Sequence, residues 1–257
     1  MVKTLNFLKR EGSLPDCLKK FLCVFPRSSF AFTLAEVLIT LSIIGVICAL
    51  TVPNLYRKHQ EQVTVAKVKK FYATLDMAYN AAIARTGGAK YWNINNWTAE
   101  DANKLYELIF EPYFKVAKIC GTSNEGNCVI NDNYKLINGL QHGSYGKMDL
   151  YYKLILDDGA SVWFRGGIQN TTSYMGVYYD VNGLKGPNQS GVDLFDFQGY
   201  NTRIEPNGLH GGFDISCKNP TSTSAGFTCT AWVIYKGNME YLKCDDLKWD
   251  GKQKCGK

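Results

Sequence analysis

The chain has 257 residues, of which 46% are hydrophobic and 20% are charged. That composition excludes a disordered or fibrous protein and suits one domain of ordinary size with appendages. The formal net charge is +6, but residues 1–31 hold six basic side chains and only two acidic ones, so the remainder is nearly neutral. This balance carries no strong nucleic-acid signature, because electrostatic capture of DNA needs a clustered basic surface. Weak or local contact with DNA stays open.

Residues 1–31 mix basic, apolar and turn-forming side chains, and Pro15 and Pro26 prevent a long helix there. We interpret this segment as a leader. Residues 32–52 then run for 21 positions with a single charge, that of Glu36. About 20 apolar residues at a rise of about 1.5 Å span the hydrocarbon core of a bilayer, so this segment predicts a transmembrane helix. A buried helix of a soluble protein is disfavoured, because such helices are rarely apolar on every face.

The pattern changes after Pro53, which we expect to kink the helix because its ring removes one backbone hydrogen bond. Residues 54–84 are polar on one side, while apolar side chains recur mostly every three or four positions. They are Val68, Phe71, Leu75, Tyr79, Ala82 and Ile83. This periodicity predicts an amphipathic helix that stops at Gly87 and Gly88. The predicted parts are therefore a leader (1–31), a membrane helix (32–53), an amphipathic helix (54–88) and a globular head (89–257).

The sequence of the head predicts a small antiparallel sheet with one short helix. The whole chain is therefore expected to have an α+β fold in which the long helix packs on the sheet. Thr98 with an acid three residues later predicts a helix start. Residues 151–156 and 161–164 flank Asp157-Asp158-Gly159, a hairpin signal. Further strands are expected at 175–180 and 231–235, with 239–242 as a partner of the last.

Six cysteines follow the apolar segment, without CxxC spacing and without histidines at zinc-finger spacing. They favour disulfides, and therefore an oxidising compartment outside the cytosol, over buried free thiols. Short local loops are the simplest connectivity, although sequence does not choose among about 15 pairings. The couples would be Cys120 with Cys128, Cys217 with Cys229, and Cys244 with Cys255.

Glu36 is a carboxylate in an otherwise uncharged membrane segment, and such a residue is a functional hypothesis by default. Residues 31–41, AFTLAEVLITL, resemble the prepilin cleavage and methylation motif of type IV pilins and type II secretion pseudopilins. Pro53 lies at the twenty-second position from Phe32, as is typical of that family. The resemblance implies cleavage by a prepilin peptidase between Ala31 and Phe32, followed by methylation of the new terminus. It also implies that Glu36 pairs with the terminal amine of a neighbouring subunit.

The partners implied by the resemblance are other pilin or pseudopilin subunits, the prepilin peptidase, the assembly machinery of the inner membrane and membrane lipid. The implied location is a single pass through the cytoplasmic membrane, with the head outside the cytosol and then on a filament or the cell surface. Expected functions are a structural subunit of a type IV pilus or secretion pseudopilus, or a minor pilin whose head binds DNA, a glycan or a secreted substrate. No HExxH, GxSxG or phosphate loop is present, so we do not expect an enzyme.

Residues 180–196 alternate oxygen-bearing side chains with glycines and a proline. Such a loop can surround Ca²⁺, with Asp180, Asn182 and Asp193 as candidate ligands. It is similar to the calcium loop of major pseudopilins, but these residue types are also those that tight turns use. Residues 229–242 are rich in aromatics, which could bind sugar or a partner but more often form the packed face of a sheet.

Overall fold

The computed structural model describes residues 33–169 and 173–256. Ala31 and Phe32, the residues on either side of the expected cleavage, lie outside the described residues. The chain divides into two structural units between Asn54 and Leu55. The second unit contains the sheet and both hydrophobic clusters of buried residues.

Helix α2 (Leu34–Thr86) includes the apolar segment, continues through Pro53 and ends just before Gly87. Within the second unit, its buried side chains repeat every three or four residues, as the sequence pattern predicts. Val68, Leu75, Tyr79 and Ala82 are fully buried and Phe71 nearly so, while Ile83 packs on the cluster from a partly buried position. The aromatic ring of Phe71 stacks on Tyr179 of the sheet, with 4.1 Å between ring centroids.

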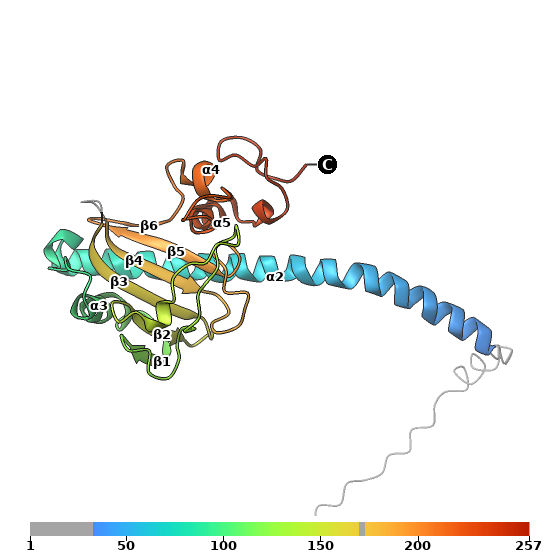
Figure 1. Cartoon of the computed structure of the whole chain (residues 1–257), viewed down its shortest axis with the longest axis horizontal. Coiled ribbons are helices and arrows are strands. Elements are labelled where there is room, and N and C mark those ends of the chain that lie inside the picture. Colours follow the sequence, from blue (N-terminus) through green and yellow to red (C-terminus); the bar gives the residue numbers. More distant parts are fainter. Residues whose placement is uncertain (1–32, 170–172, 257) are drawn as a thin grey trace, which may run out of the picture. The chain divides into compact units, whose positions relative to one another are not determined.

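One antiparallel sheet covers this part of α2, and its six strands follow chain order (Figure 1). The strands are β1 (Val116–Gly121), β2 (Tyr152–Leu156), β3 (Ser161–Gln169), β4 (Ser173–Asp180), β5 (Leu194–Tyr200) and β6 (Ile204–Pro206). The predicted strands at 151–156, 161–164 and 175–180 are confirmed. The sequence pattern did not reveal β1, β5 and β6, and β5 places Asp196 in a strand rather than in the loop to which we assigned it.

The hairpin between β2 and β3 forms at the predicted turn. Leu156 N–H donates to the Ala160 carbonyl at 2.9 Å, and Gly159 has a φ of 83°. Glycine adopts that left-handed conformation without the steric cost that a Cβ would bring. The turn therefore fixes the register in which Trp163 pairs with Lys153.

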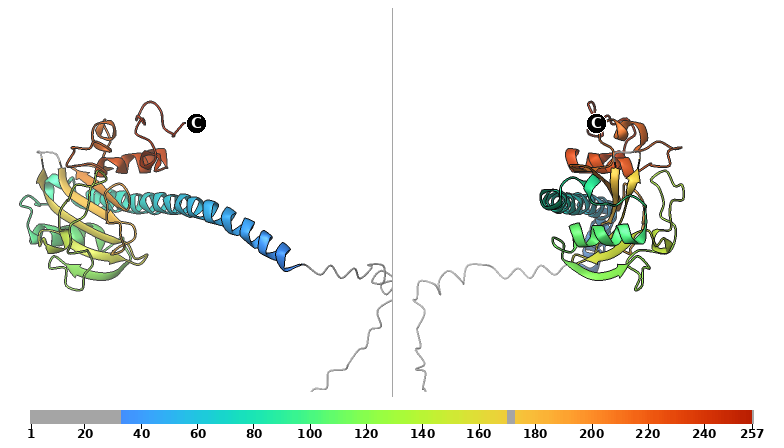
Figure 2. Two further views of the ribbon diagram at one scale, coloured as in Figure 1. Left: turned by 45° about the vertical axis from the view of Figure 1, so that its right-hand side comes forward. Right: turned by 90° about the vertical axis from the view of Figure 1, so that its left-hand side faces the viewer.

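Short helices surround the sheet. The helix expected after Thr98 is α3 (Ala99–Leu105), whose N-cap Thr98 hydroxyl accepts a hydrogen bond from Asp101 N–H, and it continues as a π-helical turn (Tyr106–Phe110). The remaining helices are α4 (Gly212–Ser216), α5 (Thr230–Lys236), and 3-10 turns at Ala89–Tyr91, Tyr145–Lys147, Phe227–Cys229 and Glu240–Leu242. Figure 2 shows α3 against the β2 and β3 side of the sheet, and α4 and α5 beyond β6.

The strands expected at 231–235 and 239–242 are wrong, because these residues form α5 and a 3-10 turn. Trp232 and Val233 are buried among the apolar residues that also pack on α2, so tertiary packing outweighs their strand propensity. Gly237 ends α5 with a φ of 68°, the left-handed conformation of a helix C-terminal glycine. Trp232 of α5 and Tyr241 of the 3-10 turn are therefore core residues outside the sheet, whereas Tyr235 is exposed.

The two faces of the sheet differ in chemistry, since alternate residues of a strand point to opposite sides. On β3, Val162 and Phe164 join the cluster that includes α2. Trp163 joins a second cluster, under the loops that contain Tyr134, Tyr145 and Phe227. This second face, which we call the loop-covered face, also carries buried polar side chains, among them Lys153, Asp180 and Asp196.

Candidate functional site

The apolar segment of α2 is exposed along its whole length, including Leu38, Ile43 and Leu50. Among the described residues, α2 is the one helix long and apolar enough to cross a membrane. An apolar surface of this size costs free energy in water, roughly 25 cal/mol for each Å². The segment is therefore compatible with a single-pass membrane helix.

Glu36 lies in the first turn of α2 and bonds to Thr33, the residue before the helix. Its carboxylate Oε2 accepts hydrogen bonds from the Thr33 backbone N–H and hydroxyl, both at 2.8 Å. Glu36 N–H donates in return to the Thr33 hydroxyl at 3.2 Å. This reciprocal arrangement is a capping box, which satisfies backbone donors at a helix start. Glu36 thus orders the first turn of the helix even without a partner subunit, while its exposed carboxylate keeps lone pairs for another donor.

The structure brings together the three residues proposed as calcium ligands. Asn182 donates through Nδ2 to Asp193 Oδ2 at 3.3 Å, and its backbone N–H donates to Asp180 Oδ1 at 3.2 Å. Asp193 also accepts backbone N–H bonds from Asn188 at 2.9 Å and from Gln189 at 2.7 Å. These contacts close the loop upon itself. Much of the acceptor capacity of Asp193 is therefore used within the protein.

Some oxygen atoms of the same loop remain without a partner among the described residues. They are the buried Oδ1 atoms of Asn182 and Asn188. Burial, reinforced by the nearby charge of Asp193, raises the pKa of Asp180 to about 8, a cost that a cation would relieve. However, the described residues contain no group of three or more His, Cys, Asp or Glu side chains that could hold a metal ion. Calcium at this loop stays a prediction.

The six cysteines of the head form the three disulfides that short loops favour. Cys120 is joined to Cys128, Cys217 to Cys229, and Cys244 to Cys255, with Cα atoms 5.9, 4.9 and 5.8 Å apart. The first two are buried, and the third is only partly buried. Each closes a loop of about a dozen residues or fewer, which by chain entropy stabilises the folded state by roughly 2–4 kcal/mol.

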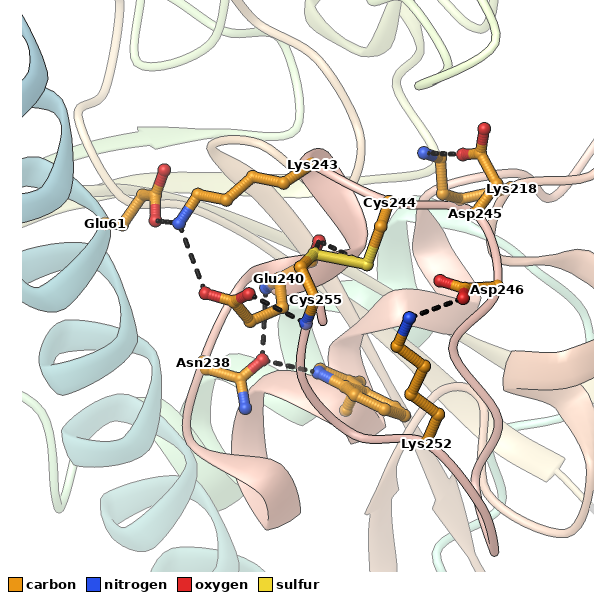
Figure 3. The surroundings of a disulfide bond; sticks show 11 residues. Glu61, Lys218, Asn238, Glu240, Lys243, Cys244, Asp245, Asp246, Lys252 and Cys255 are labelled. Atoms are coloured by element: carbon orange, nitrogen blue, oxygen red, sulfur yellow. Dashed lines mark hydrogen bonds and ion pairs between the residues drawn. A yellow bond between two sulfur atoms is a disulfide. The ribbon is translucent and has the colours of Figure 1, made fainter. Parts of the chain in front are cut away.

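The third disulfide lies beside an ion-pair group that attaches the C-terminal segment to α2 (Figure 3). The Lys243 ammonium donates to the Glu61 carboxylate of α2 at 2.7 Å and to Glu240 at 3.3 Å. Glu240 also accepts from Cys255 N–H at 3.1 Å. These groups are partly exposed, so their role is to orient the segment more than to add much stability.

Sequence reasoning missed the polar centre of the loop-covered face. The Asp196 carboxylate is buried and accepts a hydrogen bond from Asn207 Nδ2 at 2.7 Å. Arg165 lies two strands away, on the same face as Trp163. Strand alternation could have placed Trp163 and Arg165 together, opposite Val162 and Phe164. Asp196 could not be placed near Trp163 and Arg165, however, because strand β5 was not recognised in the sequence.

Comparisons with protein-family models, with curated proteins and with solved structures find no match for this chain.

Proposed function

We propose that this chain is a structural subunit of a type IV pilus or type II secretion pseudopilus, processed by a prepilin peptidase and assembled through its N-terminal helix. The observation that carries the proposal is a lone carboxylate, Glu36, in the first turn of an exposed apolar helix. The likeness of residues 31–41 to the prepilin motif supports it.

Physical chemistry explains why such a carboxylate would serve assembly. A charge inside a bilayer costs about 2.5–3.5 kcal/mol by insertion scales, and simulations give more. A cleaved chain would add a second charge, the amine of Phe32, close to the Glu36 carboxylate of a neighbouring copy. Pairing removes both costs at once, but only when two helices stand in the correct register. The pair would therefore select one arrangement of subunits, while the apolar surface supplies most of the contact area.

The capping box allows a test that separates the charge of Glu36 from its local role. Glutamine also serves at this position of a capping box, so Glu36→Gln keeps the Thr33 bonds and removes only the charge. Thr33→Val does the reverse, because it removes the hydroxyl and keeps the carboxylate. We expect Glu36→Gln to lower incorporation into sheared filaments at least about tenfold, as loss of one buried ion pair implies, and Thr33→Val to retain it.

Recovery of each variant from membranes, measured in the same cells, controls for expression and insertion. Normal incorporation of the Glu36→Gln subunit would contradict the assembly role of the charge. Equal loss in both variants would assign Glu36 to helix capping alone.

A further inference from the structure

Arg165 on β3 has an unusual environment for a charged side chain. Its guanidinium carbon lies 4.4 Å from the ring centroid of Trp97 and 5.3 Å from that of Tyr151, so it lies over two aromatic rings. Arg165 is partly buried, and its Nε atom is buried without an acceptor among the described residues. No carboxylate in that part of the chain lies within ion-pair distance of it. A guanidinium carries five N–H donors, and here the buried Nε–H has no acceptor among the described residues.

The backbone around Arg165 is adapted to hold this arrangement. Trp97 packs flat on Gly167, where a Cβ would come within 2.2 Å of the indole ring, so only glycine permits the contact. Gly167 pairs with Asn96 through an isolated β-bridge, which fixes the segment that carries Trp97. Stacking on fixed rings also removes much of the rotamer freedom of the arginine. The guanidinium is therefore pre-organised before any ligand arrives.

Open space lies beside the guanidinium. Gly176 on β4 is the cross-strand neighbour of Arg165, and Gln198 on β5 is the next residue across the sheet. A Cβ at Gly176 would meet a single atom, Cε2 of Tyr178, at 3.9 Å. Glycine thus leaves a notch between Arg165, Tyr178 and Gln198, all of which are partly exposed. A small group can reach the arginine there from solvent.

Further donors border the notch. The rings of Tyr145 and Tyr178 lie 4.9 Å apart, and those of Tyr145 and Tyr151 lie 5.2 Å apart. The Tyr145 hydroxyl is buried without a partner among the described residues. Burial raises the pKa of all three tyrosines, so their hydroxyls stay protonated and can donate. Among the described residues, the Tyr145 hydroxyl and the Arg165 Nε–H are thus buried donors without an acceptor, which suits an acceptor ligand.

We propose that this site, formed by Trp97, Tyr151, Arg165, Gly176 and Tyr178, binds a singly charged carboxylate of a small ligand or an acidic sugar. The planar fork of a guanidinium matches a carboxylate with two parallel N–H bonds. One negative charge is favoured over two because the site offers a single cation, with Asp196 close by on β5. The inference does not depend on filament assembly, so each can fail without the other.

The test is titration calorimetry of the full chain in detergent micelles with glucuronate, propionate, glucose and inorganic phosphate. We expect glucuronate to bind and glucose not to bind, since they differ in the carboxylate. Tighter binding of glucuronate than of propionate would identify a sugar acid, and equal binding a free carboxylate. Binding of glucose as tight as that of glucuronate, binding of phosphate alone, or no binding of either acid would overturn the proposal.

Three variants sharpen the test. Arg165→Gln should weaken glucuronate binding at least about tenfold, through loss of a charge-assisted bidentate contact. Arg203→Gln is the matched control, because Arg203 also lies over a ring, that of Tyr200 at 4.9 Å, but pairs with Glu205 at 2.7 Å. Gly176→Val fills the notch and leaves Arg165 in place, so it decides the matter if Arg165→Gln fails to fold. Unchanged affinity in both Arg165→Gln and Gly176→Val would refute the site.

Discussion

The carboxyl group of Asp196 is buried on β5, on the loop-covered face of the sheet. Burial raises its pKa to about 7, against the lowering effects of the Asn207 hydrogen bond and of Arg165. Asp180, on the neighbouring strand, has a pKa raised to about 8 for the same main reason. In both cases the folded state keeps a proton that the unfolded chain releases near pH 4. The two groups therefore link the stability of the head to pH.

The sign of this linkage is specific. The stabilisation from each group is complete below about pH 4 and is lost as the pH rises through the folded-state pKa. We expect the free energy of unfolding to fall between pH 5 and pH 7.5 by on the order of 5 kcal/mol, since the two groups together titrate over about four pH units in this range and each unit corresponds to about 1.4 kcal/mol. Lys153 has a pKa lowered to about 8 and acts in the opposite sense, but only above that pH.

Urea unfolding of the full chain in detergent, followed by tryptophan fluorescence at pH 5 and pH 7.5, measures this difference. Asp196→Asn has no titrating carboxyl, so the difference should shrink, and Asp157→Asn is an exposed control that should leave it unchanged. A wild-type midpoint that stays constant or rises between the two pH values would show that these carboxyl groups do not titrate as the structure implies.

At the scale of elements, the part of α2 in the second unit is held by its apolar stripe more than by intrinsic helix propensity. Leu75 is fully buried against the sheet, whereas Met77, two residues later, is 54% exposed. We expect Leu75→Ala to lower the free energy of unfolding by about 2–5 kcal/mol, since it removes buried methyl groups and leaves a cavity. Met77→Ala should change it by about 0.5 kcal/mol or less. Equal effects in a urea titration would show that this stripe does not face the core.

The features that could be predicted from the sequence are those with a local signal. The period of apolar residues in α2 and the Asp-Asp-Gly turn between β2 and β3 are local signals, and both were interpreted correctly. The segment at 230–236 is rich in strand-forming residues, and only its packing around Trp232 makes it helical. The edge strand β1 was missed because it pairs with β2, which lies far along the chain, and β6 was missed because Ile204–Pro206 is too short to show an alternating pattern. The pairing of the six cysteines matches the one expected from the short spacing within each couple.

The candidate sites also differ in whether a local sequence pattern indicates them. Glu36 was found because one charge in an apolar run is visible in the sequence alone. The hydrogen bonds between Asp180, Asn182 and Asp193 lie within one loop, so the sequence could group these residues. The contact of Trp97 with Arg165 joins residues 68 positions apart. It depends on Gly167 and on the register of the strands, so no local sequence pattern predicts it.

At the scale of the whole molecule, the described chain combines an exposed apolar helix segment with a disulfide-linked α+β head. The exposed segment requires lipid or apolar helices as its surroundings. Three disulfides in the head favour an oxidising compartment. The proposed filament subunit, which would be held in a membrane before assembly, would account for both properties.

The measurement that tests this account most directly is mass spectrometry of the protein recovered from membranes of cells that contain a prepilin peptidase. We predict an N-terminal peptide that begins at Phe32 and carries one methyl group on its amine. A control without the peptidase should retain the leader, residues 1–31. A chain that still begins at Met1 in the presence of the peptidase, or one cleaved at another position, would contradict the proposed function.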